Sequence, residues 1–150
     1  DWDDVEVVDF DDCDDVETMT FGDNFEFEVD LSGQDKLNLK WDEEFNEEFA
    51  AKYDYANIDF INFVKTPSFN KNGTAYIFAE KDEFVYEVTE DGAKAVKAEW
   101  NADYDAWEIK TRKLTSYVLS DVELDKQTVT EDKNESSKPE SGKDNPDTGR

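Results

Sequence analysis

The stretch Phe25-Glu26-Phe27-Glu28-Val29-Asp30-Leu31 alternates apolar and acidic residues, and Leu37-Asn38-Leu39-Lys40-Trp41 alternates in the same way. A period of two is typical of a β-strand with one buried and one solvated face. Residues 32–35, Ser-Gly-Gln-Asp, join the two runs and have the composition of a turn. The sequence therefore predicts a β-hairpin over residues 25–41, with one face toward a core and one toward water.

The same period continues toward the C-terminus. It predicts a turn at residues 70–73, a second hairpin from 74–80 and 83–89 around Lys81-Asp82, a turn at 90–92, strands at 94–100 and 107–112 joined by a reversal at 101–105, and a last strand at 117–119. Consecutive strands joined by tight turns usually pair as neighbours. We expect a mainly β fold, an antiparallel meander that forms a β-sandwich or an open barrel.

One segment breaks this period and predicts a short α-helix at about residues 43–53. Asp42 is the expected N-cap, acidic residues fill the first turn, and Phe45 and Phe49 fall at i and i+4 on one face. Residues 57–64 follow with apolar side chains at successive positions, which predicts a buried strand in mid-sheet or under the helix.

The chain divides into a domain, residues 1–124, and a polar tail, residues 125–150. The only aliphatic residue of the tail is Val129. A segment that buries so little apolar surface cannot offset the entropy lost on ordering, so we expect a disordered, solvated tether. In contrast, 14% of the whole chain is aromatic, enough for the domain to build a core.

The chain is strongly acidic, with 41 acidic and 16 basic residues and a net charge of −25. The domain accounts for 34 acidic and 11 basic residues, a net charge of −23. Such a field repels phosphate backbones and anionic lipids, so we expect no nucleic-acid partner and no membrane contact by the domain. The sequence also contains no apolar run long enough to be a membrane span.

The residue types present in the chain exclude several classes of catalytic and metal site. There is no histidine, which excludes Ser-His-Asp and Cys-His nucleophile systems and histidine-based zinc sites. Cys13 is the single cysteine, so the chain forms no internal disulfide; we expect a small buried side chain, with an intermolecular disulfide or reactive thiol as the alternative. A glycan-active enzyme would need two carboxylates in a cleft, and 41 acids make no pair informative. We therefore expect no catalysis and no obligatory cofactor.

The N-terminal segment is the candidate cation site. It contains Asp9, Asp11, Asp12, Asp14 and Asp15 within seven residues. Crowded carboxylate oxygens suit calcium, and extracellular modules use weak calcium sites. No EF-hand pattern is present, because the glycine and the final glutamate of the loop are missing. The alternative is a set of solvated acids that protects strand edges from aggregation.

A second candidate site is aromatic. Trp100 and Trp107 flank the turn at residues 101–106, and Tyr104 lies near its tip. Flat aromatic faces beside Asp and Asn are typical of carbohydrate-binding platforms. The alternative is a cross-strand tryptophan pair that packs the hairpin or the core.

The tail contains Asn145-Pro146-Asp147-Thr148-Gly149 directly before Arg150. This pentapeptide resembles the N-P-x-T-G sorting signal of sortase-anchored Gram-positive surface proteins. The resemblance implies cleavage after Thr148 by a sortase and attachment to cell-wall peptidoglycan. The apolar span and basic residues that follow the signal in that family are not in this sequence, and the alternative is a polar terminus rich in turns.

A second resemblance covers most of the domain. Residues 107–124, which include Tyr117-Val118-Leu119-Ser120-Asp121, are similar to the membrane-proximal end of large surface proteins of gut clostridia, as are residues 20–41 and 49–60. That family implies location and architecture rather than activity. We therefore expect a noncatalytic extracellular module of a cell-wall-anchored protein. This module would be a stalk, spacer or adhesin domain, the last with a host or microbial surface ligand. The first alternative is a calcium- or carbohydrate-binding module, and the outside alternative is a glycan-active enzyme.

Overall fold

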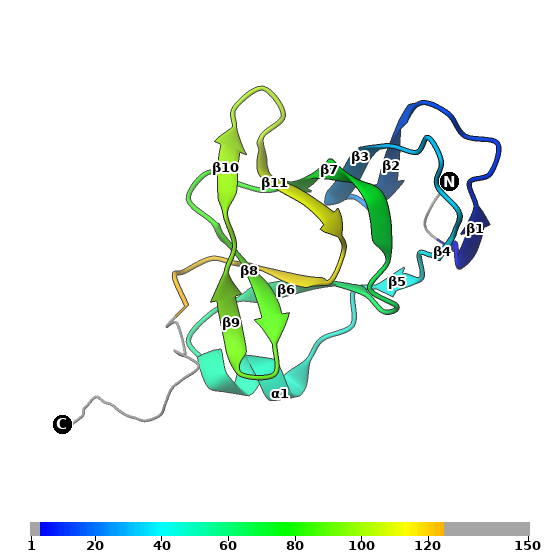
Figure 1. Ribbon diagram of the computed structural model, residues 1–150. Helices are drawn as coiled ribbons and strands as arrows, with labels where there is room; N and C mark the ends of the chain where they lie inside the picture. Colours follow the sequence, from blue (N-terminus) through cyan, green and yellow to red (C-terminus); the bar gives the residue numbers. More distant parts are fainter. Residues whose placement is uncertain (1–3, 125–150) are drawn as a thin grey trace.

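The computed structural model describes residues 4–124, which form two antiparallel sheets facing each other, with a short helix against the second (Figure 1). The first sheet has the order β10-β11-β7-β3-β2; its strands are β2 Val16–Phe21, β3 Phe25–Asp30, β7 Ser68–Phe78, β10 Ala98–Asn101 and β11 Ala106–Lys113. The second has the order β5-β6-β12-β8-β9; its strands are β5 Trp41–Asp42, β6 Ile58–Phe63, β8 Phe84–Thr89, β9 Gly92–Ala95 and β12 Ser116–Ser120. A small ribbon pairs β1 Val7–Asp9 with β4 Lys36–Asn38. The predicted mainly β, antiparallel class is confirmed, and its form is sandwich-like rather than a closed barrel.

Neighbouring strands are consecutive in four places, β2-β3, β5-β6, β8-β9 and β10-β11, and these are the meander-like parts of the fold. The other neighbours in the two large sheets are joined by longer connections: β3 with β7, β7 with β11, β6 with β12, and β12 with β8. The hairpins at residues 90–92 and 101–105 and the strand at 117–119 are confirmed. A simple meander of consecutive neighbours is therefore not the connectivity.

The hairpin predicted over residues 25–41 is wrong in its pairing. The first run is β3, but its partners are β2, which pairs Phe21 with Phe25, and β7. The second run separates into β4 and β5, which pair with β1 and β6. Alternation specifies which face of a strand is buried and carries no information on its partner, so a turn in the right place did not make a hairpin.

The hairpin predicted from residues 74–80 and 83–89 is also wrong, because β7 and β8 lie in different sheets. The expected strand at 94–100 crosses between sheets as well, with β9 in the second, β10 in the first, and Val96 packed on the core between them. In the second segment the alternation breaks at the adjacent apolar residues Ala95 and Val96, where the chain passes from β9 to β10. Strands that switch sheets in a sandwich do so through such an irregularity.

The turn predicted at residues 70–73 is wrong, since these residues lie inside the 11-residue strand β7. A glycine is required at position 73 because neighbouring atoms of β3 leave no room for a side chain, and not because the chain turns there. A Cβ on Gly73 would lie 2.5 Å from the backbone oxygen of Glu28 and 2.7 Å from the ring of Phe27. Close approach of β7 to β3 therefore explains this glycine.

The helix begins later than predicted, with α1 at Glu47–Ala50 and a 3₁₀ turn η1 at Ala51–Tyr53. The N-cap is Asn46, whose Oδ1 accepts a hydrogen bond of 3.0 Å from the backbone N–H of Phe49. Asp42 belongs to β5 and its carboxylate instead accepts from the backbone N–H of Glu44, which closes a local turn. Phe45 precedes the helix and is 62% exposed, whereas Phe49 is buried.

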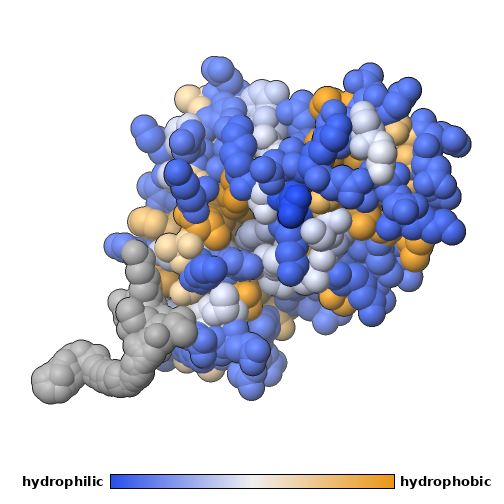
Figure 2. All heavy atoms as spheres, in the orientation of Figure 1, coloured by the Kyte–Doolittle hydropathy of each residue, from blue (hydrophilic) through white to orange (hydrophobic). Residues whose placement is uncertain are grey.

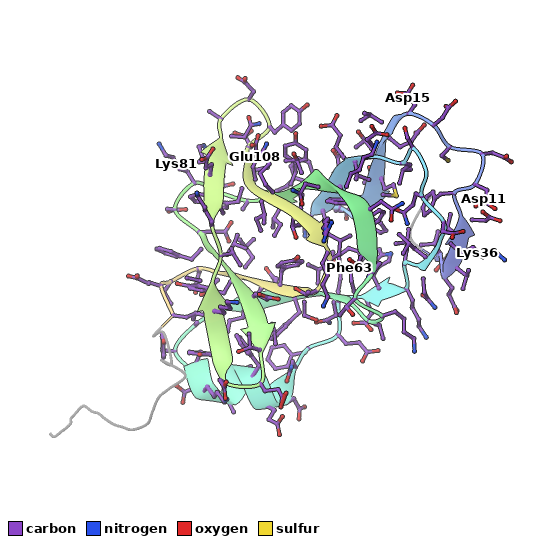
Figure 3. The ribbon with its side chains drawn as sticks, viewed as in Figure 1. Asp11, Asp15, Lys36, Phe63, Lys81 and Glu108 are labelled. Carbon is purple, nitrogen blue, oxygen red and sulfur yellow. The ribbon has the colours of Figure 1, made fainter. Side chains whose placement is uncertain are left out.

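Two hydrophobic clusters hold the fold together, and hydrophilic side chains cover most of the face that Figure 2 shows. The larger fills the space between the sheets and is rich in phenylalanine; Figure 3 shows Phe63 in this interior, where its ring lies 5.0 Å from that of Phe21. The smaller lies between the other face of the second sheet and the helix, where Phe49 contacts Phe60 with ring centroids 5.8 Å apart. The predicted buried strand at residues 57–64 is confirmed as β6, which lies both in mid-sheet and under the helix because its successive side chains face the two clusters.

Candidate functional site

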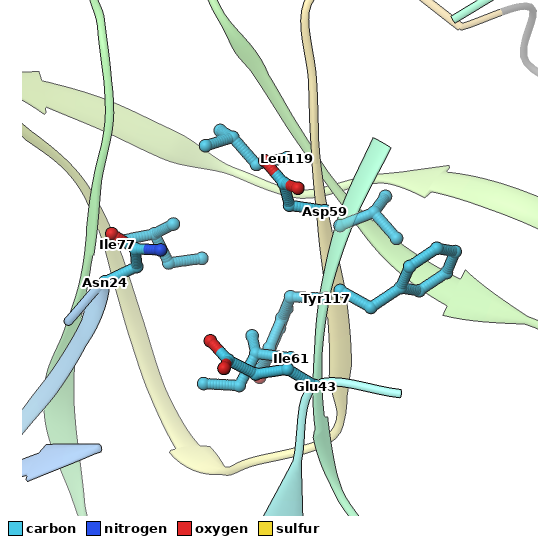
Figure 4. Close-up of a pocket in the computed structure, with 9 residues that line it drawn as sticks. Asn24, Glu43, Asp59, Ile61, Ile77, Tyr117 and Leu119 are labelled. Atoms are coloured by element: carbon cyan, nitrogen blue, oxygen red, sulfur yellow. The ribbon is translucent and has the colours of Figure 1, made fainter. Parts of the chain in front are cut away.

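A cleft of about 260 Å³ opens between the two sheets (Figure 4). Its lining includes Ile77 from the first sheet and Ile61 and Tyr117 from the second, and its polar residues are Asn24, Glu43 and Asp59. Figure 4 shows Asn24 and Ile77 on one side, across from Asp59 and Glu43. The cleft thus combines an apolar floor with carboxylate and amide groups.

Each polar group reaches this cleft from a different element. Asn24 lies in the β2–β3 turn, and its backbone oxygen accepts a 2.9 Å hydrogen bond from the N–H of Phe78. Glu43 follows β5 directly, and Asp59 is the second residue of β6. The position of each side chain therefore depends on the sandwich as a whole.

A neighbouring hollow of about 420 Å³ shares Asn24, Asp59 and Leu119 with this cleft and adds Glu80, Glu83, Tyr104 and Asp105. The two spaces together are called the acidic cleft here. The described side chains that line it include five carboxylates, and none is Lys or Arg. Such a lining favours a ligand that presents hydrogen-bond donors or positive charge to the rim and apolar surface to the floor.

The turns around the acidic cleft are held by short hydrogen bonds. The backbone N–H of Glu80 donates to the carboxylate of Glu83 at 2.8 Å, and the N–H of Ala79 donates to the backbone oxygen of Asp105 at 3.1 Å. Asp105 has a φ of 54°, a left-handed conformation that Asp tolerates better than most residues. This rim is thereby fixed to the ends of β7 and β11.

The predicted cation site lies away from the acidic cleft, at the end of the molecule that carries β1. Asp11 and Asp15 project outward there (Figure 3). The carboxylate of Asp9 accepts the backbone N–H of Asp11 at 2.9 Å, and that of Asp15 accepts the N–H of Val16 at 2.7 Å. The charge of Asp9 raises the pKa of Asp11. Within residues 4–124, no three acidic or cysteine side chains lie close enough together to hold a metal ion. The calcium site at Asp9, Asp11, Asp12, Asp14 and Asp15 therefore stays a prediction.

The predicted aromatic platform is divided between two faces of the first sheet. Trp100 and Trp107 are opposite each other in the β10–β11 ladder, half-buried, with ring centroids 5.3 Å apart and an edge-on angle of 68°. Tyr104 instead packs on Tyr76, with centroids 4.9 Å apart. Tyr76 pairs with Glu108, whose side chain faces away from that of Trp107, because successive residues of a strand alternate. The structure therefore brings the two tryptophans together on one face of the first sheet. Tyr104 packs on the opposite face and lines the acidic cleft.

Other residues singled out from the sequence are placed as follows. Cys13 is a free thiol, half-buried and packed against the main core. The sorting-like residues Asn145, Pro146, Asp147, Thr148 and Gly149 lie outside the described residues, as does the whole tail from 125 to 150.

The acidic cleft was not found from the sequence. Its carboxylates lie at positions 43, 59, 80, 83 and 105, without any shared spacing. The strand pairing alone brings them together, and the pairing predicted from the sequence is wrong for several strands. Local spacing could not have identified the acidic cleft.

Comparison with protein-family models, with curated proteins and with solved structures yields no match. In the part of the chain that the structure describes, no helix has the length and apolar character needed to cross a membrane.

Proposed function

We propose that this chain is a noncatalytic extracellular module of a cell-wall-anchored surface protein, with the role of a stalk, spacer or adhesin domain. The observation that carries the proposal is the pentapeptide Asn145-Pro146-Asp147-Thr148-Gly149, which lies beyond a domain with its own core. A sortase and cell-wall peptidoglycan are the partners that this signal implies.

Two features of the domain support a stalk or spacer role. The beginning and the end of the described chain lie on opposite sides of the molecule, with β1 at one side and the orange end of the coloured ribbon at the other (Figure 1). Leu124 is buried, and its backbone N–H donates a 2.9 Å hydrogen bond to the hydroxyl of Tyr86. Modules that enter at one side and leave at the other add length to a chain when they are linked in series.

The anchoring proposal is tested by transpeptidation in vitro. The full chain is incubated with a sortase that accepts N-P-x-T-G signals and with a glycine-based amine, and the products are measured by intact mass. We expect loss of Gly149-Arg150 and addition of the amine to Thr148. The matched control is Thr148→Ala, which removes the scissile residue and leaves the domain unchanged. An unaltered mass of the natural sequence would remove the anchoring proposal.

The alternative function is a ligand-binding surface module, for carbohydrate or for calcium. The acidic cleft favours carbohydrate, since apolar side chains beside carboxylate and amide groups suit the C–H faces and hydroxyls of a sugar. A glycan array read with the natural chain, a Trp107→Ala variant and an Asp59→Asn variant separates the tryptophan pair from the acidic cleft. A blank array would remove the carbohydrate alternative.

Calcium is tested by the melting temperature. Calcium chloride and sodium chloride are compared at equal ionic strength, because screening alone stabilises so acidic a chain. A rise specific to calcium that is lost in an Asp11→Asn/Asp12→Asn variant supports the cation site. Equal melting temperatures in the two salts would eliminate it.

The outside alternative is a glycan-active enzyme. Glu43 and Asp59 line the same cleft, and hydrolysis of a glycoside uses two carboxylates across the scissile bond. Turnover of a panel of aryl glycosides that disappears in both Glu43→Gln and Asp59→Asn would replace the noncatalytic proposal.

A further inference from the structure

A second opening between the sheets has the opposite charge. It is called the basic hollow here, has a volume of about 400 Å³, and is lined by Lys94, Lys97 and Lys113 around Val96, Ile109 and Glu87. It meets β11 and β12 near residues 113 and 115, the end of one strand and the beginning of the other. The acidic cleft is lined by Asp105, directly before β11, and by residues 117–119 of β12, so Tyr117 lines both openings. The two openings therefore share Tyr117 and differ in their charged residues.

The lysines of the basic hollow have no fixed carboxylate partner among the described residues. In that part of the chain, Lys71 and Asp30 form the one ion pair, at 3.2 Å. Glu87 lies directly opposite Lys94 in the β8–β9 ladder, yet its carboxylate accepts a 2.9 Å hydrogen bond from the hydroxyl of Thr115. In a chain with 41 acidic and 16 basic residues, a group of unpaired lysines around one opening is a local reversal of the overall field.

The frame of the basic hollow is well supported. Ile109 and Tyr117 are buried, and Val96 packs on the main core. The hydroxyl of Tyr117 donates to the backbone oxygen of Lys113 and accepts from the N–H of Thr115, both at 3.3 Å. The β11–β7 register shifts between Thr111 and Lys113, and such an irregularity redirects the side chains that follow it.

Lys110 also lines the basic hollow, but its ammonium lies 3.4 Å from the hydroxyl of Thr74, to which it donates. Thr74 is its neighbour in the β11–β7 ladder. Lys110 is therefore engaged along the sheet, and Lys94, Lys97 and Lys113 are the donors available to a ligand.

We propose that the basic hollow binds a sugar acid, that is, a carbohydrate unit with a single carboxylate. Its volume falls within the usual range for small-ligand sites. Ammonium groups supply charge-assisted hydrogen bonds to a carboxylate, and Val96 and Ile109 offer apolar contact to a sugar ring. The net charge of −25 repels an extended polyanion, whereas one compact carboxylate meets the local field of the basic hollow, where Lys94, Lys97 and Lys113 outweigh Glu87. This proposal is independent of anchoring, because binding is measured on the isolated chain.

The test is an NMR titration of the ¹⁵N-labelled full chain with glucuronate, with glucose and inorganic phosphate as comparison ligands at equal ionic strength. We expect glucuronate to shift the amides of Val96, Lys97, Ile109 and Lys113, with a dissociation constant of about 1 mM, typical of a weak small-ligand site. We expect no saturable shift with glucose. Phosphate that binds as tightly as glucuronate, or glucuronate that shifts none of these amides, would overturn the proposal.

A matched pair of variants tests the location. Lys94→Gln/Lys97→Gln/Lys113→Gln removes the three donors, and Lys40→Gln/Lys65→Gln/Lys81→Gln removes the same charge from exposed lysines elsewhere. We expect binding at least tenfold weaker in the first variant and within twofold of the natural chain in the second, with folding of both checked by circular dichroism. Equal weakening in both would assign the effect to net charge and contradict the basic hollow.

The source of the sugar acid is resolved by a methyl glucuronide. Equal binding of the methyl glucuronide and of free glucuronate supports recognition of the end of a glycan chain. Binding of free glucuronate alone supports recognition of the soluble acid at the same site.

Discussion

The hydroxyl of Tyr86 accepts a 2.9 Å hydrogen bond from the backbone N–H of Leu124, and both groups are buried. This contact attaches the last described residue to β8, an interior strand of the second sheet. We expect Tyr86→Phe to lower the free energy of unfolding by about 1 kcal/mol, the usual net value of one hydrogen bond, and the melting temperature by a few degrees. Thermal unfolding measures the change, with Tyr104→Phe at an exposed ring as the control. Equal melting of the two variants would contradict this role of Tyr86.

Gly73 allows β7 to approach β3. Because an added Cβ would lie 2.5 Å from the Glu28 backbone oxygen and 2.8 Å from the Val29 Cβ, Gly73→Ala should force the two strands apart. We expect a loss of about 3 kcal/mol, at the upper end for overpacking. Chemical denaturation measures it, and Asn72→Ala at the exposed neighbour should change stability by less than about 0.5 kcal/mol. A neutral Gly73→Ala variant would show that the strands can adjust.

Asn46 rather than Asp42 caps the helix. Asn46→Ala should cost about 1 kcal/mol and speed hydrogen exchange of the Phe49 amide, because that N–H loses its side-chain acceptor. Asn46→Asp retains an acceptor and should restore both quantities. Equal exchange rates in the Ala and Asp variants would contradict the cap.

Asp30 should titrate at an unusually low pH. Hydrogen bonds from the hydroxyl and the backbone N–H of Ser32, followed by that of Lys71, lower the pKa of Asp30 to about 2. A carboxyl whose pKa is lower in the folded chain stabilises the fold above its ordinary pKa near 3.8, and this contribution is lost as the pH falls from there through about 2. Carbon-detected NMR measures the pKa directly.

Two variants rank the causes of that low pKa. Ser32→Ala removes the hydroxyl, which makes the largest contribution, so it should raise the pKa of Asp30 more than Lys71→Gln does. A larger rise in the Lys71 variant would show that charge, rather than hydrogen bonding, holds Asp30 ionised.

The sequence predicted the class of the fold because alternation and turn composition act locally. The runs at residues 25–31, 57–64 and 117–119 are strands, and the two hairpins around Gly92 and around residues 101–105 are formed as expected. Each of these features depends on neighbours within a few residues. In contrast, β3 pairs with β7, which lies more than 40 positions further along the chain. No local sequence pattern contains the information that these two strands pair.

The difference between local patterns and long-range pairing also explains which candidate sites could be predicted from the sequence. The tryptophan pair was found from sequence because Trp100 and Trp107 flank a hairpin turn, and only their surroundings needed the structure. The role of Gly73 was mispredicted because a glycine close to Asn and Lys is typical of a turn. In the structure, this glycine is required because the backbone of β3 lies too close for a side chain. The acidic cleft and the basic hollow both arise from pairing between distant segments, so neither has a signature in the sequence.

The placement of β12 has a mechanical consequence. This strand is hydrogen-bonded on both sides, to β6 and to β8, and residues beyond it are tied down by Asp121, which accepts from Asn57, and by Tyr86. Tension that enters at Leu124 along the strand axis must load two ladders simultaneously. Rupture then requires many bonds to yield together instead of unzipping one after another, so the domain should resist a steady pull well beyond what a terminal edge strand could bear.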